Sequence, residues 1–593
     1  MNIEETIKSH LSRAFAELFD HSLPTEDISL QPTRKEFSGS HTFVTFPYAR
    51  ITHKSPSDTA EALGSYLKNT EVIQDFNVVK GFLNLEVSDA VWLSVLDEIV
   101  QSSTRSTQSS NGQRVTVEFS SPNTNKPLHL GHLRNNFLGY STAQILEANG
   151  YEVFKTSIIN DRGVHICKSM LAYQKFGQEE TPTSSDKKGD YLVGEYYVKF
   201  DQAYKKQVQE LVSQGTPEAE AKKEAPLMQE VQTMLQRWEQ GDPEVVALWQ
   251  QMNGWVYEGW DDTYQKIGVS FDQQYYESDT YLLGKDAVEE GLAQGVFFRK
   301  EDGSVWIDLA DEGLDQKLVL RADGTSVYMT QDLGTVELRY RDRPFDKMVY
   351  VVGNEQDYHF NVLFKILKKL GRPYADGLYH LSYGMVDLPS GKMKSREGTV
   401  VDADDLIAEV VEAARQQTEQ LGKIEDFTEE QARELYHTLG VGALKYFMLK
   451  VDPKKRMLFN PEESVQLQGN TAPFIQYTHA RIAAITRKAN ADGVATDVVS
   501  ETTTLEPSER ELIVLLNEFS AKVALAALEY SPSVIAQYAY DLAKAYNRFY
   551  TEVSIFGEAN TESVRFRVTL SSVVARVIKQ AMGLLGINVP ERM

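Results

Sequence analysis

The hydrophobic and polar positions in the middle of the chain follow two periods in turn. Residues 115–119, VTVEF, form a short β-branched and aromatic run that predicts a buried strand. A polar turn over 120–125 follows, and apolar residues then recur at helical spacing within 129–150, which ends in the C-cap pair Asn-Gly. Residues 151–159 predict another strand. The pattern therefore predicts a strand, a turn, a helix and a second strand in succession.

The same alternation returns further along the chain. Residues 326–329, 347–352 and 378–386 predict strands, with helices beginning near Asp332 and covering 357–370. Polar side chains recur where the predicted strands end. In a parallel sheet with helices on both faces, such ends line one crevice, where ligands bind. We therefore expect an α/β fold with a Rossmann-like parallel-sheet catalytic domain.

Two other segments have a different character. Residues 1–100 predict a small N-terminal α/β domain with strands over 38–51 and 78–87, and 101–113 is poor in apolar residues and predicts a linker. Residues 177–272 are helical and charged, which predicts a helical insertion in the sheet domain. We expect its tryptophans to pack between its helices.

The last third of the chain predicts an all-α helix bundle. The expected helices cover 405–420, 429–450, 461–468, 473–490, 509–530, 533–553 and 563–585. Within them, Phe474, Tyr477 and Arg481 share one helical face. An exposed face of this kind stacks unpaired bases and contacts phosphates, whereas a buried one is bundle core with a snorkelling arginine. The spacing alone slightly favours the buried alternative.

Composition limits the class of protein. A chain of 593 residues predicts three to four domains, and 42% hydrophobic with 25% charged residues is typical of a globular protein in water. The single cysteine, Cys167, excludes an internal disulfide framework. No apolar run reaches the roughly 18 residues of a membrane helix, and the acidic amphipathic N-terminus is neither a secretion signal nor a transit peptide. We therefore expect a cytoplasmic protein with no membrane partner.

The net charge of −24 argues against a nucleic-acid partner. It does not exclude one, because local basic and aromatic surfaces bind tRNA while acidic residues lie elsewhere. Composition alone favours an enzyme that acts on small molecules.

The turn before the first predicted helix contains paired histidines, in the order Lys126, His129, Leu130, Gly131 and His132. A helix N-terminus beside the end of a strand is a ready anion site, Gly131 allows close approach, and the imidazoles add donors for phosphate oxygens. A His-x-x-His pair is at least as often half a set of metal ligands or plain surface polarity. A zinc site needs further ligands at suitable spacing, and the chain has one cysteine.

A second basic loop, residues 392–399 (KMKSREGT), contains cations between glycines. Such a loop can close over a triphosphate and neutralise charge that develops on leaving pyrophosphate. Considered alone, it would more often be a solvated basic loop.

In this setting HLGH resembles the HIGH signature of class I aminoacyl-tRNA synthetases, and residues 120–135 resemble those of the arginyl-tRNA synthetases. The second loop is similar to the KMSKS loop, with a departure: Lys392 and Met393 align, but Ser395 replaces the second lysine and Lys394 stands one place early. Arginyl enzymes commonly lack that lysine and carry one before HIGH, which Lys126 matches. The resemblance covers nearly the whole chain and is weakest in the insertion.

The resemblance implies a ligase that activates L-arginine with ATP, bound as its Mg²⁺ complex, and transfers arginine to the terminal adenosine of tRNA(Arg). It implies no zinc or prosthetic group, and we expect a monomer. The residues assigned to catalysis are His129, His132, Lys126 and Lys392. Those assigned to ATP are Leu130, Gly131, Met393, Lys394 and Ser395.

Arginine makes a separate physical demand. Its guanidinium is planar and permanently charged with five donors, so a selective pocket needs carboxylates. Glu118, Asp332 and Tyr328 match the family's guanidinium positions. Without the resemblance, Tyr328 would be a strand-end aromatic and Asp332 a helix N-cap. The full set assigned to arginine is Glu118, Ser120, Asn123, Tyr328, Asp332 and Gln356.

The resemblance also implies how the segments meet tRNA. Residues 1–100 would bind its elbow, 114–405 would be catalytic, 406–460 would contact its stem and 461–593 would bind its anticodon. The elbow residues would be Phe82 and Asn84, although core for Phe82 and a turn for Asn84 are equally favoured. The residues assigned to the anticodon are Phe474, Tyr477, Arg481 and Met593.

Three alternatives remain at this point. A cysteinyl or glutamyl synthetase would keep both signatures, but the former would be expected to bind zinc through several cysteines and the latter to have cations around its side-chain pocket. A HIGH-type nucleotidyltransferase would be much shorter. A catalytically dead tRNA-binding paralogue is disfavoured because both histidines and Lys392 are intact.

Overall fold

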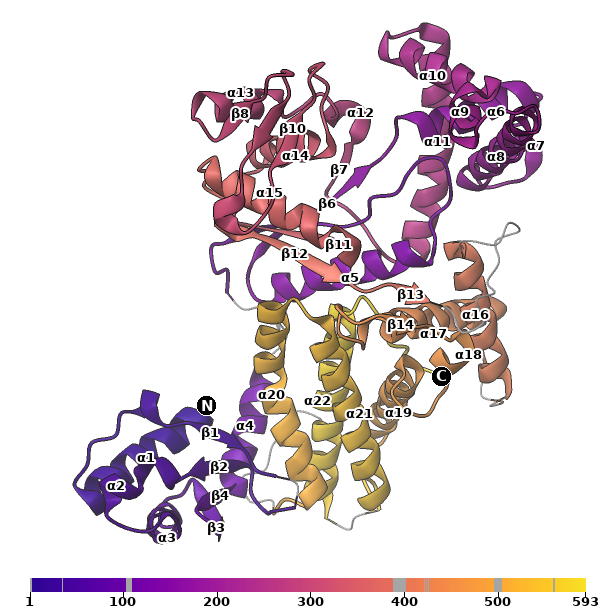
Figure 1. Ribbon diagram of the computed structural model, residues 1–593. Coiled ribbons are helices and arrows are strands. Elements are labelled where there is room, and N and C mark those ends of the chain that lie inside the picture. Colours follow the sequence, from indigo (N-terminus) through magenta and orange to yellow (C-terminus); the bar gives the residue numbers. More distant parts are fainter. Residues whose placement is uncertain are drawn as a thin grey trace.

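The computed structural model describes residues 3–34, 36–102, 109–387, 401–420, 422, 424, 426–494, 504–557 and 560–593. In Figure 1 the N-terminal domain lies beside the C-terminal helices, and the α/β domain with its helical insertion lies at the opposite end of those helices. Among the described residues, no helix is long and apolar enough to cross a membrane.

The N-terminal domain contains a four-stranded antiparallel sheet in the order β1-β2-β4-β3. Its strands are β1 (Leu30–Pro32), β2 (His41–Val44), β3 (Ile73–Val79) and β4 (Phe82–Val87), and its helices are α1 (Ile3–Phe19), α2 (Ala49–Thr52), α3 (Pro56–Leu67) and α4 (Asp89–Gln101). The expected single strand over 78–87 is wrong. Lys80 and Gly81 have φ of 49° and 84°, so the chain turns there into a hairpin between β3 and β4.

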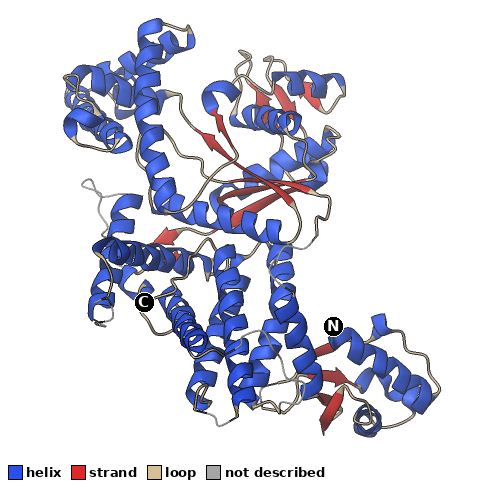
Figure 2. Cartoon of the chain, turned by 180° about the vertical axis from the view of Figure 1, so that it is seen from behind, coloured by secondary structure: helices blue, strands red, loops and turns tan. Residues whose placement is uncertain are grey.

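The predicted parallel sheet is confirmed. It has five strands in the order β12-β11-β5-β6-β7, and each neighbouring pair is parallel. The strands are β5 (Arg114–Glu118), β6 (Glu152–Ile159), β7 (Gln273–Tyr276), β11 (Lys347–Gly353) and β12 (Leu378–Tyr383). The helices between them are α5 (Leu130–Ala148), α14 (Tyr328–Asp342) and α15 (Asp357–Lys369). Figure 2 shows the crossing strands with helices around them.

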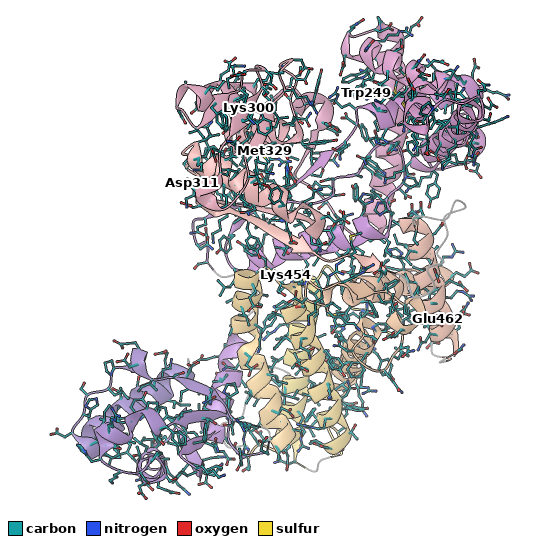
Figure 3. All side chains as sticks on the ribbon, in the orientation of Figure 1. Trp249, Lys300, Asp311, Met329, Lys454 and Glu462 are labelled. Atoms are coloured by element: carbon teal, nitrogen blue, oxygen red, sulfur yellow. The ribbon has the colours of Figure 1, made fainter. Side chains whose placement is uncertain are left out.

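A helical insertion follows β6. Its helices are α6 (Val164–Phe176), α7 (Pro182–Ser185), α8 (Gly189–Ser213), α9 (Glu218–Glu224), α10 (Pro226–Glu239) and α11 (Pro243–Lys266). The Trp238 and Trp249 rings are 5.3 Å apart, and the indole N–H of Trp249, labelled in Figure 3, donates to the carbonyl of Asp161 at 2.6 Å. These tryptophans therefore pack between helices, as expected.

The sequence did not predict a second, antiparallel sheet in the order β10-β9-β8. It consists of β8 (Phe297–Arg299), β9 (Val305–Ile307) and β10 (Lys317–Leu320), preceded by α12 (Glu277–Thr280) and α13 (Lys285–Ala293). The expected strand over 326–329 is also wrong. The Thr330 hydroxyl accepts from the N–H of Val327 at 3.1 Å, so Tyr328 and Met329 form the first turn of α14.

The C-terminal part is helical, as predicted. Its helices are α16 (Ala403–Gln420), α17 (Glu429–Leu449), α18 (Pro461–Ser464), α19 (Ala472–Ala491), α20 (Pro507–Glu529), α21 (Pro532–Glu552) and α22 (Thr561–Leu584). A short parallel pair, β13 (Val386–Asp387) and β14 (Met457–Leu458), joins it to the sheet domain.

Helix α5 connects the sheet to the helical domain. The Arg134 guanidinium is fully buried and donates to the carbonyls of Pro453 and Lys455 at 3.0 and 2.9 Å. Further along the helix, the Ser141 hydroxyl donates to the carbonyl of Leu584 at 2.8 Å. The polar side chains of α5 thus fix the two domains against each other.

We expect Arg567→Met to destabilise the helical domain. Glu509, whose side chain is 2% exposed, lies 2.8 Å from Arg567 across the bundle. Removing one partner of a buried pair leaves an uncompensated charge and costs about 3–5 kcal/mol. Scanning calorimetry should show a Tm several degrees lower. Arg565→Met is the matched control, because Arg565 is 43% exposed and 3.8 Å from Glu562. Equal shifts in the two variants would contradict the argument.

Candidate functional site

The paired histidines open helix α5. His129 is its N-cap, and the Nδ1 of His129 accepts a hydrogen bond from the N–H of Gly131 at 3.1 Å. The Nδ1 of His132 accepts from the N–H of His129 at 3.1 Å, and the ring centroids are 3.8 Å apart. Since a neutral imidazole has one proton, each ring keeps it on Nε2. The turn therefore supplies two neutral ring donors beside a helix N-terminus.

The electrostatics of this turn keep the imidazoles neutral. Burial and the Lys126 ammonium lower the pKa of His129 to about 4. Burial, followed by His129 and Lys126, holds the pKa of His132 well below its usual value. Burial lowers the pKa of Lys126 as well. The turn thus combines one lysine with two uncharged donors, which suits a polyanionic ligand.

Residues 401–403 lie along this turn. The N–H of Leu130 donates to the carbonyl of Val401 at 3.0 Å, and Asp402 pairs with His129 in an isolated β-bridge. The start of α16 therefore fixes the backbone that carries the first histidine.

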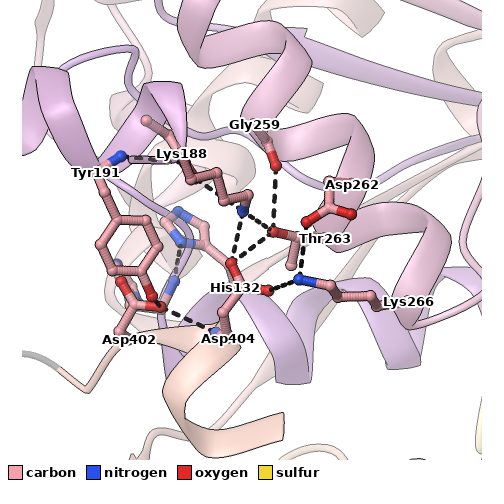
Figure 4. Close-up of polar contacts among 11 residues, drawn as sticks. His132, Lys188, Tyr191, Gly259, Asp262, Thr263, Lys266, Asp402 and Asp404 are labelled. Atoms are coloured by element: carbon pink, nitrogen blue, oxygen red, sulfur yellow. Dashed lines mark hydrogen bonds and ion pairs between the residues drawn. The ribbon is translucent and has the colours of Figure 1, made fainter. Parts of the chain in front are cut away.

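The insertion holds the same segment from the other side, as Figure 4 shows. The Lys188 ammonium lies 2.5 Å from both Asp404 Oδ2 and Thr263 Oγ1. The Tyr191 hydroxyl donates to Asp402 Oδ1. Side chains from α11 and from the start of α8 thus converge on two aspartates next to the histidine turn.

Two acidic side chains lie near each other, one at the end of β5 and one in the first turns of α14. Glu118, at the end of β5, is buried and forms an ion pair with Arg339. Burial is the main cause of its raised pKa, which Arg339 opposes and the nearby Asp332 increases. The Asp332 carboxylate is 41% exposed and lies 2.5 Å from His359 Nε2. Tyr328 is 80% exposed, so its side chain lies on the surface.

Sequence reasoning missed Arg339 and His359. Arg339 follows Asp332 by seven residues, which places both on one face of α14 and was a usable signal. His359 lies on α15, and nothing in the sequence links it to Asp332.

The other residues assigned to arginine lie at strand ends. Asn123 is exposed next to β5 and pairs with Asn160 in a β-bridge, and Gln356 is exposed at the start of α15. Ser120 is buried with a φ of 64°, and its hydroxyl lies 2.7 Å from the hydroxyl of Tyr264. A positive φ at a non-glycine residue is a strained conformation, and Ser120 adopts it in the turn that follows β5.

Lys392, Met393, Lys394 and Ser395 lie outside the described residues. The described segments that flank them are anchored: Asp387 in β13 forms an ion pair with Arg456, and Val401 binds the histidine turn.

A groove of 780 Å³ in the helical domain brings together three of the four residues assigned to the anticodon, Tyr477, Arg481 and Met593. The Arg481 guanidinium lies 4.9 Å from the centre of the Tyr477 ring and 4.8 Å from that of Tyr550. Phe474 is separate, since its ring packs 5.6 Å from Tyr540 within the bundle. Other cations in the groove are Arg487, Lys488 and Arg592.

In the N-terminal domain, Asn84 is buried and hydrogen-bonded within the sheet. Its amide accepts from Thr42 at 2.6 Å and donates to Asn77 at 2.8 Å. Phe82 is half-buried and its ring lies 5.5 Å from that of Phe46, which is 48% exposed. Phe46 and Phe82 thus form an aromatic patch, whereas Asn84 lies inside the sheet.

Three family models match successive parts of the chain. They describe the N-terminal domain of arginyl-tRNA synthetase over 1–87, the catalytic domain of class I (R) tRNA synthetases over 95–460, and the DALR anticodon-binding domain over 475–593. Together they account for the three parts of the fold.

Relatives match over the full length. The chain is 58% identical to an arginine–tRNA ligase from Amoebophilus asiaticus and 54% identical to one from Bacteroides fragilis, with 100% of each chain covered. The fold is shared with the solved arginyl-tRNA synthetase of Thermus thermophilus, at a TM-score of 0.77, 24% identity and 100% coverage of both chains. These matches exclude the cysteinyl, glutamyl and short nucleotidyltransferase alternatives. The chain belongs to the arginyl-tRNA synthetase family of class I aminoacyl-tRNA synthetases.

Proposed function

We propose that this chain activates L-arginine with ATP to arginyl-adenylate, releasing pyrophosphate, and then transfers arginine to the terminal adenosine of tRNA(Arg). The observation that carries the proposal is a phosphate-type turn with two neutral imidazole donors in the same sheet domain as an acidic pair, Glu118 and Asp332. Full-length relatives that are named arginine–tRNA ligases support it.

The first step is attack of the arginine carboxylate on the α-phosphate of ATP. Little covalent work falls to the protein, so catalysis is positioning and charge stabilisation. We assign His129 and His132 to the phosphates, with the Leu130-Gly131 backbone giving room for close approach. Lys126 and Lys392 neutralise the leaving pyrophosphate, and Met393, Lys394 and Ser395 complete the ATP site. Bound Mg²⁺ would share the charge of the triphosphate.

Arginine is selected by acceptors that match its guanidinium. Glu118 and Asp332 supply carboxylates, and Tyr328 approaches from the surface of α14. Asn123, Gln356 and Ser120 take the α-amino and carboxylate side of the substrate. His359 and Arg339 hold the two carboxylates in place.

Different parts of the chain contact different parts of the tRNA in this proposal. We propose that residues 1–100 bind the elbow through Phe82 rather than through Asn84, that 101–113 is a linker, that 114–405 is catalytic, that 406–460 contacts the stem, and that 461–593 binds the anticodon. Because the structure buries Asn84, Phe82 and Phe46 are the side chains available there. We expect a cytoplasmic monomer without zinc or a prosthetic group.

ATP–pyrophosphate exchange with each of the twenty amino acids, with and without tRNA, tests the reaction. Among the twenty amino acids, we expect only arginine to support exchange. Exchange driven by another amino acid would overturn the proposal. So would the absence of exchange when arginine and tRNA(Arg) are both present.

The histidines should not contribute a pH step near neutrality. With a pKa of about 4 for His129 and a lower than usual pKa for His132, protonation begins only as the pH falls well below 6.5. We expect kcat/KM for ATP to show no imidazole inflection between about pH 6 and about pH 8. An inflection in that window that disappears in His129→Asn would contradict the neutral pair.

Asp332→Ala should weaken arginine recognition without unfolding the protein. Losing one charge-assisted hydrogen bond costs about 1.5–3 kcal/mol, so we expect the arginine KM to rise at least about tenfold. The KM for ATP should change little. Asp376→Ala is the control, because Asp376 is 83% exposed and pairs only on the surface with Lys368. An unchanged arginine KM would remove Asp332 from the pocket.

Tyr477→Ala should weaken tRNA binding. Loss of one base–aromatic stack costs about 1–3 kcal/mol, which is a roughly five- to hundredfold rise in the Kd for tRNA(Arg). Leu528→Ala is the control, because Leu528 is 79% exposed on α20 and outside the groove. Fluorescence titration with tRNA(Arg) measures both, and equal Kd values for the two variants would place Tyr477 outside the interface.

A further inference from the structure

The helical insertion carries two side chains that reach the adenylation site without lying in it. Lys188 is the N-cap of α8 and Tyr191 is in its first turn. The Tyr191 ring reaches Asp402, and the Lys188 ammonium lies between Thr263 of α11 and Asp404 at the start of α16 (Figure 4). Neither residue is among those that the proposed function assigns to a substrate.

The contacts form a continuous chain from the insertion to His129. Tyr191 donates its hydroxyl to Asp402 Oδ1, and the same oxygen accepts the N–H of Asp404 at 2.9 Å. Asp402 is in turn the residue whose backbone pairs with His129. Each link is a hydrogen bond or a strand pairing between described residues.

A second set of contacts makes the arrangement rigid. Asp404 accepts from Lys188 at 2.5 Å, from Thr263 at 3.1 Å and from Lys266 at 3.2 Å. Lys188 also contacts Asp190, which is fully buried. The Asp404 carboxylate thus joins α8, α11 and the start of α16, and the Lys188 ammonium offsets the two carboxylates that flank it, buried Asp190 and partly exposed Asp404.

We propose that Lys188 and Tyr191 are positioning residues for adenylate formation, which hold residues 401–404 against the turn that begins at His129. The proposal rests on the proposed function, because it assumes that this turn binds the phosphates of ATP. It gives the insertion a role in the reaction: α8 and α11 set the backbone geometry from which the two imidazoles act. Displacing catalytic groups by a fraction of an ångström is enough to slow phosphoryl chemistry.

Tyr191→Phe tests the proposal, because it removes one hydroxyl and keeps the ring. We expect the KM for ATP or the kcat of exchange to worsen by roughly five- to twentyfold, while the arginine KM stays within about twofold. Tyr204→Phe is the matched control, since that hydroxyl donates to the carbonyl of Lys222 within the insertion, away from the site. Equal kinetics for the two variants would overturn the proposal.

A double-mutant cycle separates positioning from general destabilisation. If Tyr191 acts through Asp402, then Tyr191→Phe has no further effect on the rate of ATP–pyrophosphate exchange in an Asp402→Ala background. Additive losses of the two changes would overturn the proposal.

Amide hydrogen exchange gives a readout that does not depend on the reaction. In Tyr191→Phe and Lys188→Met, the peptide that contains the N–H of Leu130, which is bound to Val401, should exchange faster. Unchanged amide hydrogen exchange in both variants would overturn the proposal. By contrast, failure of the proposed function would appear in the unmodified enzyme as ATP–pyrophosphate exchange that arginine does not stimulate.

Discussion

Helix α5 is enclosed by the rest of the molecule, and its burial fixes how the parallel sheet and the helical domain are placed relative to each other. Fourteen of its nineteen residues are buried, and it contacts strands of the parallel sheet and helices α16, α17, α20, α21 and α22. A helix buried all round cannot have one polar face for solvent. Its polar side chains therefore need partners inside the protein. Arg134, Asn135 and Ser141 have them, whereas the buried polar atoms of Asn136 and Thr142 have no hydrogen-bond partner. Asn135 accepts the N–H of Ser120 at 2.6 Å and donates to the carbonyl of Val351 at 2.6 Å, which ties together the carboxyl ends of β5 and β11, two neighbouring strands of the parallel sheet.

Overall acidity and nucleic-acid binding coexist because charge is distributed unevenly. The chain has a net charge of −24, yet four cations, Arg481, Arg487, Lys488 and Arg592, line one groove with aromatic side chains among them. Phosphates respond to the local potential within about a Debye length, roughly 8–10 Å, rather than to the net charge.

Much of the fold could be predicted from periodicity, and the failures have physical causes. The parallel strands and the C-terminal helices have long, regular patterns, so the sequence was sufficient for them. The start of α14 was misplaced because Val327 and Tyr328 are typical strand residues, and the hydrogen bond from the N–H of Val327 to the hydroxyl of Thr330 marks the start of the helix. The β8–β10 sheet was missed because three-residue strands leave no periodic signal. The sequence pattern does not distinguish Phe474 from Tyr477 as a side chain that contacts the anticodon. The structure does, because Phe474 packs against Tyr540 within the bundle. The acid pair was predictable as residue types, but its internal partner Arg339 depends on how α14 meets β5.

The tautomer of the two imidazoles has a consequence for turnover. Nδ1 of each ring accepts a backbone N–H, so on the proposed function His129 and His132 would meet the phosphates as uncharged donors. Hydrogen bonds from neutral donors are about half as strong as those from cations. An active site built only from lysines and arginines would retain a multiply charged leaving group after bond cleavage. On the proposed function, uncharged rings would stabilise the same oxygens while the bond breaks and would release pyrophosphate more readily afterwards, so this tautomer would limit product inhibition.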